Sequence, residues 1–219
     1  MVTPDLASEE DIAKLTIPDD LPDERPTFKA YIEAKIYDKE GHLIQYHRQP
    51  MRSLTQYFLA FMSAVLVGTF AIGGNNTAQS ILVNALGFPS QASNNSNCAG
   101  ILWDFTIQLG SGSQAFSLTL SGLAAPIANG TGSGELAYLG NSISLAGSYI
   151  FFGITVQNFS GSTINVTEIG LFENVQIQCG SCATTYNYNF LLSYDTFSTA
   201  VSIPNGGLAM FQVTFVFSG

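Results

Sequence analysis

Residues 208–217 read LAMFQVTFVF, and this stretch decides the fold class of the chain. Every odd-numbered position in it is apolar, from Ala209 to Phe217, and the even-numbered face includes Gln212 and Thr214. A period of two residues is typical of a β-strand with one face covered. The preceding residues, 204–207 (PNGG), combine proline, asparagine and glycine, which predicts a tight turn. We therefore expect a strand whose odd-numbered face lies in a core or at an interface.

Similar short segments extend back from this strand and are separated by Gly, Ser and Asn residues. We predict strands near residues 101–109, 115–120, 135–139, 142–148, 149–158, 163–172 and 186–194. Many short strands with frequent turn signals favour an antiparallel β-sandwich, and we expect a jelly-roll-like one. The predicted fold class is mainly β, with a sandwich body over residues 73–219.

A β-hairpin is predicted over residues 27–49. Alternate residues from Phe28 to Ile36 are apolar, and Lys, Tyr and Glu occupy the positions between them. The sequence DKEG at 38–41 supplies turn chemistry. His42 and His47 lie on this polar-edged hairpin, where we expect solvated or hydrogen-bonded roles and no bound metal.

Residues 1–26 form an acidic, proline-rich segment. They hold eight of the 16 carboxylates and four of the eight prolines. Such a composition buries too little apolar surface to fold alone, so we predict an arm that is extended or that becomes ordered only on a partner. Four apolar residues are spaced along it, and a neighbouring subunit could bury them: Ile12, Leu15, Ile17 and Leu21.

A helix is predicted over residues 50–72. Ser53 and Gln56 have the spacing of a capping box, and the residues that follow are apolar on all sides. A helix of that kind must be buried, and we favour burial in protein. Residues 54–72 also approach the length of a membrane span and follow Arg48 and Arg52, so membrane contact through this segment stays open.

Charge is distributed very unevenly along the chain. Residues 53–219 contain no Lys, Arg or His, and only five carboxylates. This region cannot neutralise phosphates, which argues against nucleic-acid binding. It also lacks His and Lys for acid–base work near neutral pH. Such a body is typical of a building block that neighbouring copies cover, rather than of a catalyst.

Four segments resemble one family of proteins. They are IQLGSG at 107–112, LAAPI at 123–127, TINVTEIGLF at 163–172 and FLLSYD at 190–195. These segments are similar to β-sandwich virion proteins of viruses and phages, particularly those that infect thermophilic archaea, and to related extracellular fibre subunits. The resemblance covers about the last 120 residues. It implies a structural role, with copies of the chain and other virion proteins as partners, in a virion or on an extracellular surface.

The chain departs from the family pattern at Ser193, where relatives often carry Arg beside the aspartate. A salt bridge at that position is therefore absent, and we expect Asp195 to accept backbone amides instead.

Cysteine usage suggests a structural disulfide. Cys179 and Cys182 have CxxC spacing, but the chain has no second CxxC and no histidine near them. A disulfide is the more plausible use, either between these two or between one of them and Cys98. In the resembling proteins this segment is a variable loop, which favours a structural disulfide in an exposed insertion.

Five N-glycosylation sequons lie in the cation-free region. They begin at Asn75, Asn94, Asn129, Asn158 and Asn165. Chance accounts for some of them in a sequence this rich in Asn, Ser and Thr. Occupied sequons would place the protein outside a cell or on a particle.

No catalytic constellation is visible, and we expect no enzyme activity and no cofactor. Asp104 and Glu135 are carboxylates on separate predicted strands, and nothing in their spacing supports glycoside hydrolysis. A membrane-anchored or surface-exposed carbohydrate-binding adhesin is the alternative. Six aromatic residues are candidates for stacking on sugars in that case: Trp103, Tyr138, Tyr149, Tyr186, Tyr188 and Tyr194.

The sequence therefore predicts a self-assembling structural subunit of a virus particle or extracellular fibre. We expect the arm, or the strand that begins at Phe28, to complete an open sheet edge of the next copy. Besides the four arm residues, the predicted subunit-interface residues are Phe28, Ile32, Ile36, Phe211 and Phe215.

Overall fold

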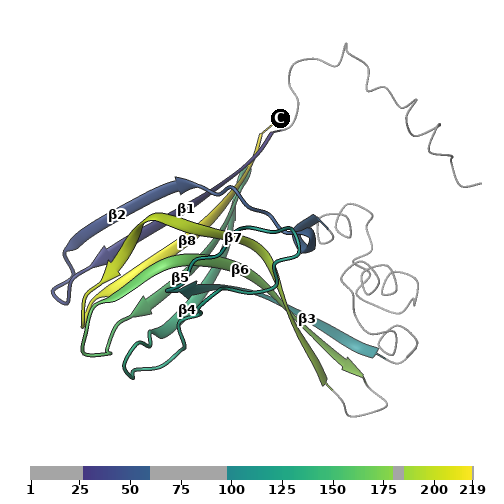
Figure 1. Cartoon of the computed structure of the whole chain (residues 1–219). Coiled ribbons are helices and arrows are strands. Elements are labelled where there is room, and N and C mark those ends of the chain that lie inside the picture. The colour runs from purple at the N-terminus through teal and green to yellow at the C-terminus, as the bar shows by residue number, and fades with distance from the viewer. Residues whose placement is uncertain (1–26, 60–97, 180–184, 219) are drawn as a thin grey trace, which may run out of the picture.

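The computed structural model describes residues 27–59, 98–179 and 185–218, and Figure 1 shows how they are arranged. These residues form eight strands, so the predicted mainly β class is confirmed. The strands are β1 (Thr27–Tyr37), β2 (Leu43–Pro50), β3 (Cys98–Gly110), β4 (Ala137–Ala146), β5 (Tyr149–Gln157), β6 (Ile164–Cys179), β7 (Thr185–Ile203) and β8 (Leu208–Ser218).

Two antiparallel sheets pack face to face as a sandwich (Figure 1). Sheet A has the strand order β2-β1-β8-β5-β4, and sheet B has the order β3-β6-β7. All strand pairs between these eight elements are antiparallel. Sheet A is wider than sheet B by two strands, and this difference governs what each edge of the sandwich exposes.

The core lies between the sheets and comes from alternate positions, as the periodicity predicts. On β8 the odd-numbered residues Ala209, Phe211, Val213 and Phe215 are buried. Opposite residues of antiparallel strands point to the same face, and β1 supplies Ile32 opposite Val213. Sheet B contributes residues such as Ile107 and Leu171. The apolar stripe of residues 208–217 is therefore core.

The hairpin is an integral part of the sandwich. β1 lies inside sheet A, between the edge strand β2 and β8, and pairs with β8 along its whole length from Thr27 to Tyr37. The predicted turns are present: Gly41 has φ 88° and Gly206 has φ 80°, a left-handed conformation that favours glycine. Sequence periodicity predicted the hairpin correctly, but it could not predict that β1 pairs with β8 and becomes an inner strand of sheet A.

The strand pattern differs from the prediction in three places. Residues 115–120 form a loop rather than a strand. The two strands predicted at 135–139 and 142–148 are one strand, β4, with an irregularity between Tyr138 and Gly140. The β6–β7 pair is longer than predicted at both ends, because its pairing runs from Ile164 opposite Ile203 to Gln178 opposite Thr185.

The helix predicted over 50–72 is described only at its beginning. Residues 56–59 are helical, and the remainder lies outside the described ranges. Thr55, rather than Ser53, caps this helix: its Oγ1 accepts the Tyr57 amide at 3.2 Å. Ser53 instead pairs with β7 through its carbonyl, which accepts the Tyr194 amide at 3.1 Å. Within the described ranges, no helix is long and apolar enough to cross a membrane.

Candidate assembly site

The β2–β7 flank of the sandwich is closed by side chains. Gln49 of β2 donates its Nε2 to the Thr196 carbonyl of β7 at 2.9 Å. The Oε1 of Gln45 accepts the Ser202 amide at 3.2 Å. The imidazole of His47 packs against the Phe197 ring, with centroids 5.3 Å apart. These contacts tie the edge strand of one sheet to the edge strand of the other.

A short connecting segment covers a further part of the β7 edge. The Thr55 amide donates to the Leu192 carbonyl at 2.9 Å, and Leu54 forms a bridge with Ser193. Thr55 Oγ1 also donates to the Leu191 carbonyl. Backbone groups that would otherwise be open to a second strand are thus used within the chain.

The opposite flank, formed by β3 and β4, is joined at one end by side-chain bonds of Tyr138 and Asn141 and is open from Ser142 onward among the described residues. β4 pairs with β5 on one side, and no described strand pairs with its other side. From Leu139 to Ala146 every residue of β4 is exposed. We call residues 139–146 the β4 edge.

Two apolar residues of the β4 edge point toward the core face and yet remain exposed. Ile143 lies opposite Phe152, and Leu145 lies opposite Ile150. Phe152 is buried against the rings of Phe105 and Phe215, so this is the inner face of sheet A. Ile143 is nevertheless 52% exposed and Leu145 is 74% exposed. The described residues of sheet B therefore leave both side chains largely uncovered.

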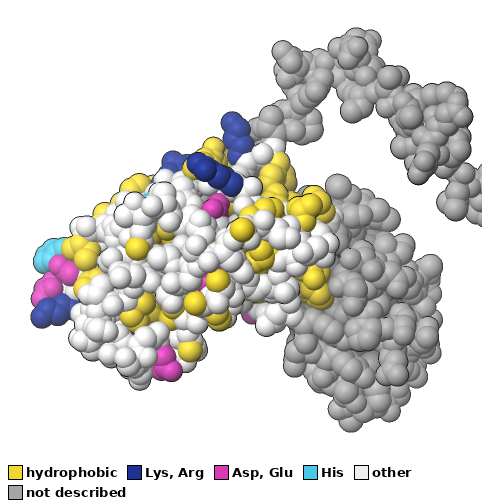
Figure 2. Space-filling model, in the orientation of Figure 1, with side chains coloured by type: hydrophobic (Ala, Val, Ile, Leu, Met, Phe, Trp, Pro, Cys, Tyr) yellow, Lys and Arg dark blue, Asp and Glu magenta, His cyan; other side chains and the backbone are white. Residues whose placement is uncertain are grey.

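The two edges of sheet A differ in charge. β2 carries His47 and Arg48 and ends at Pro50, all of which discourage another strand from pairing there. Figure 2 shows most Lys and Arg side chains along the margin where β1 and β2 lie. β4 reads AYLGNSISLA and has no charged residue. By this criterion the β4 edge is the unprotected edge of the sheet.

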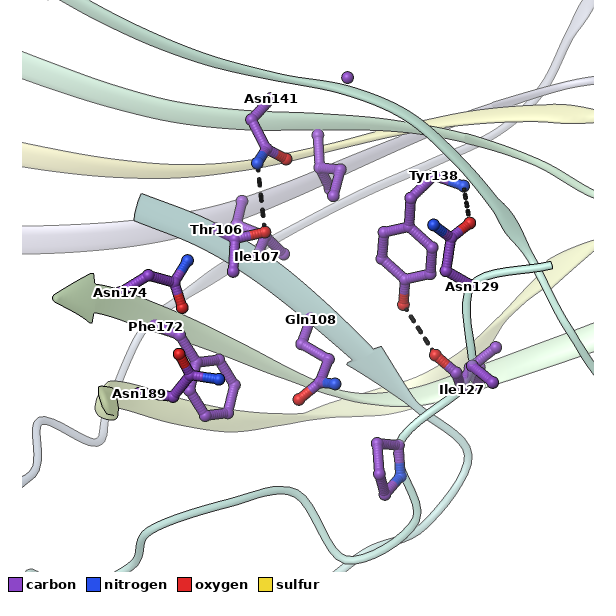
Figure 3. Close-up of a pocket in the computed structure, with 14 residues that line it drawn as sticks. Thr106, Ile107, Gln108, Ile127, Asn129, Tyr138, Asn141, Phe172, Asn174 and Asn189 are labelled. Atoms are coloured by element: carbon purple, nitrogen blue, oxygen red, sulfur yellow. Dashed lines mark hydrogen bonds between the residues drawn. The ribbon is translucent and has the colours of Figure 1, made fainter. Parts of the chain in front are cut away.

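A groove of about 560 Å³ continues from the β4 edge toward sheet B (Figure 3). Asn141 of β4 donates to Thr106 Oγ1 of β3 at 3.3 Å and bridges it. At its other end, Tyr138 donates its hydroxyl to the Ile127 carbonyl at 3.2 Å. Side-chain amides project into the groove from sheet B: Gln108, Asn174 and Asn189 (Figure 3). The lining has no Lys, Arg, Asp or Glu, and its amides stand beside apolar side chains such as Ile107 and Phe172.

The buried carboxylates elsewhere in sheet B have contrasting environments. Glu168 accepts three backbone amides, from Ala125 at 2.8 Å, Ala124 at 3.1 Å and Gly112 at 3.3 Å. These three hydrogen bonds hold the loop after β3 against β6. Glu173 is fully buried, and neither of its carboxylate oxygens has a hydrogen-bond partner among the described residues. Burial raises the pKa of Glu173 to about 8.

Asp195 accepts backbone amides, as predicted, although it lies within β7 and not in a turn. Its Oδ2 accepts the Arg52 amide at 2.9 Å, and its Oδ1 accepts the Thr196 amide at 2.8 Å. Burial raises the pKa of Asp195, and these two amides oppose that shift. The Ser193 hydroxyl beside it is buried without a hydrogen-bond partner among the described residues.

The structure corrects part of the predicted subunit interface. Ile32, Ile36, Phe211 and Phe215 are at most 4% exposed and pack in the core of a single chain. They are core residues, because their apolar faces are already covered by sheet B. Phe28 is 37% exposed at the start of β1. The arm residues Ile12, Leu15, Ile17 and Leu21 lie outside the described residues.

The cysteine and sequon predictions have mixed outcomes. The β3–β6 register places Cys98 opposite Cys179, while Cys182 lies outside the described residues. Asn158 is fully buried, and its Nδ2 donates to the Ser162 and Ile203 carbonyls, both at 2.8 Å, so the folded protein cannot accept a glycan there. Asn129 and Asn165 are exposed. Asn75 and Asn94 lie outside the described residues.

The carboxylates that were considered for catalysis are not joined by any contact. Glu135 accepts the Gly132 amide at 2.8 Å within its own turn, and Asp104 is exposed on β3. A separate cluster of ionisable side chains lies at the hairpin turn and consists of Asp38, Glu40 and His42. Hydrogen bonds of that turn explain it, since Asp38 Oδ1 accepts the amides of both other residues at 3.0 and 2.8 Å. The His42 amide contributes most to lowering the pKa of Asp38.

Sequence reasoning missed Ile143 and Leu145 as functional candidates. The strand was predicted, but its place at the edge depends on strand order, which a period of two does not reveal. The absence of charge from 137–146 could not have identified the edge, because the inner strands β5 and β8 are uncharged as well. Comparisons of the chain with protein-family models, with curated proteins and with solved structures gave no match.

Proposed function

We propose that the protein is a self-assembling structural subunit of a virus particle or extracellular fibre. The observation that carries this proposal is the β4 edge, an uncharged strand that is unpaired on one side within the described residues and has inward-pointing apolar residues left exposed. A strand from another molecule would pair with its free amides and carbonyls and cover Ile143 and Leu145. The resemblance of residues 107–195 to virion proteins supports the same role.

The donor in this mechanism is the N-terminal arm, residues 1–26. The other candidate, the strand that begins at Phe28, is β1, which already pairs on both sides with β2 and β8. Using β1 as a donor would require it to separate from both neighbouring strands of sheet A. The arm needs no such rearrangement, because it precedes the first strand of the sandwich.

Electron microscopy of the purified native protein in detergent-free buffer tests the proposal. Regular filaments or shells are expected. Leu145→Lys places a charge on the β4 edge and should leave dispersed subunits. Met210→Lys is the matched control, because Met210 is an exposed apolar residue (46%) on β8 of the same sheet. Dispersed native particles, or equal assembly by both variants, would contradict the proposal.

A carbohydrate-binding adhesin is the second candidate, and the amide-lined groove favours it. Gln108, Asn174 and Asn189 offer uncharged donors and acceptors suited to a neutral sugar. Of the aromatic candidates whose side chains are described, Tyr138 lines the groove. Tyr194 is 2% exposed, and Tyr149 is 44% exposed but stacks on Phe151. Trp103, Tyr186 and Tyr188 have side chains outside the described set. Binding on a glycan array that Asn174→Ala removes would favour this function over assembly.

A further inference from the structure

The uncovered part of the β4 edge offers a defined site for one additional strand. Ile143 and Leu145 are two residues apart, point to the inner face of sheet A and are 52% and 74% exposed. Ser142 and Ser144 alternate with them and point to the outer face. A strand that pairs here should therefore carry two apolar residues with the same spacing and no charge on the face between the sheets.

The arm contains one stretch with that pattern. Residues 13–17 read AKLTI, so that Leu15 and Ile17 share one face and Lys14 and Thr16 share the other. Pro18 follows and would end a strand formed by these residues. All eight carboxylates of residues 1–26 lie outside this stretch, at positions 5–11 and 19–24. The acidic residues can therefore stay in water while residues 13–17 are buried.

We propose that residues 13–17 of a second copy pair with the β4 edge in antiparallel orientation, with Leu15 opposite Leu145 and Ile17 opposite Ile143. This assignment rests on the proposed function and specifies its donor strand and register. The two donor side chains would cover the part of the core face that sheet B leaves open. Antiparallel addition continues the pattern of the sheet, in which all described pairs are antiparallel.

The connection to β1 favours a second copy over the arm of the same chain. β1 and β4 are antiparallel, so a strand antiparallel to β4 is parallel to β1. Parallel strands of one sheet need a crossover of about a dozen residues or more. Only residues 18–26 separate the proposed donor from Thr27, and three of these nine are prolines. A neighbouring molecule avoids this constraint.

Cysteine crosslinking in the full-length chain tests the register. Opposite residues of an antiparallel pair have Cα atoms about 4.5–5.5 Å apart, within disulfide range. The double variant Ile17→Cys, Ile143→Cys should form a ladder of covalent multimers under mild oxidation, with the linked peptides identified by mass spectrometry. The matched control, Ile17→Cys with Ser144→Cys, should not, because Ser144 points to the other face. The single variants Ile17→Cys and Ile143→Cys are the controls for crosslinks that involve the three native cysteines.

The possible outcomes separate this assignment from the proposed function. An Ile17–Ile143 crosslink confined to monomers would mean that the arm occupies its own sheet, which overturns the assignment to a second copy. Filaments that form without any Ile17–Ile143 crosslink would overturn the register but leave the structural role intact. The absence of filaments or shells would count against the proposed function itself. The variant Ile17→Asp should also lose assembly. Residue 17 precedes β1, the first described strand, so this loss is not expected to come from misfolding of the sandwich.

Discussion

Two buried polar residues, Asn158 in the loop after β5 and Glu168 of β6, hold neighbouring backbone segments in place. Asn158 and Glu168 are fully buried, and each satisfies several groups of the backbone. Gly110 lies so close to Glu168 that a Cβ at that position would be 2.3 Å from Oε1. A glycine is therefore required there to admit the carboxylate. None of this is visible in the alternation of apolar residues, because buried polar residues interrupt that pattern instead of following it.

Glu168→Ala should destabilise the protein by about 3 kcal/mol. The substitution leaves the partly buried amides of Ala124, Ala125 and Gly112 without their acceptor, and each loss costs roughly 1 kcal/mol. Urea denaturation followed by circular dichroism measures the change. Glu135→Ala is the control, since Glu135 bonds within an exposed turn and should cost much less. Equal losses for both variants would mean that Glu168 does not hold this loop in place.

Glu173 should make the folded protein less stable as the pH rises. Its pKa is about 8 in the folded protein, above the ordinary value of 4.5. The folded state therefore binds the proton more tightly, and its contribution to stability is complete below pH 4.5 and lost as pH rises through 8. Glu173→Gln should raise stability at pH 9 by roughly 2–4 kcal/mol and have little effect at pH 4.

Unfolding free energies of the Glu173→Gln and wild-type proteins across this pH range check that expectation. Glu40→Gln, at an exposed hairpin position, is the control and should leave the wild-type pH dependence in place. A wild-type stability that does not fall between pH 5 and 9 would show that the Glu173 carboxyl is not held protonated.

At the scale of elements, periodicity predicted the positions of the strands well, but it could not predict which strands pair with each other. β1, β5 and β8 were placed within a residue or so of their observed ends, because one face of each is buried and the period of two is clear. The position of β1 between β2 and β8 follows from contacts between residues about 180 positions apart, such as Ile32 with Val213. Local sequence carries no such information, and for the same reason the exposed edge was not predicted.

The register between β3 and β6 selects one of the predicted disulfides. Directly opposite residues such as Cys98 and Cys179 have Cα atoms close enough to be bridged. We predict a Cys98–Cys179 disulfide in protein isolated from an oxidising environment. Peptide mapping by mass spectrometry, with and without reductant, checks it. Peptides that link Cys179 to Cys182 would contradict the prediction.

At the scale of the whole molecule, the sandwich begins at Thr27. All described strands and the core between them lie within residues 27–218. Deleting residues 1–26 should therefore leave the melting temperature within a few degrees of that of the wild type while abolishing assembly. Deleting residues 1–37 would also remove β1 and unfold sheet A. Differential scanning calorimetry and electron microscopy of both deletions distinguish these effects, and a truncated protein that still polymerises would rule out the arm as donor.

The contrast between the two flanks has a consequence for any polymer built from this subunit. One flank is sealed by Gln45, Gln49 and residues 53–55, and the other presents the bare β4 edge. Copies joined by donor arms would all face the same way, so the polymer would have polarity. One terminus would display an empty acceptor and the other a free arm. The two termini would then grow by different reactions, and each would need a different protein to stop it.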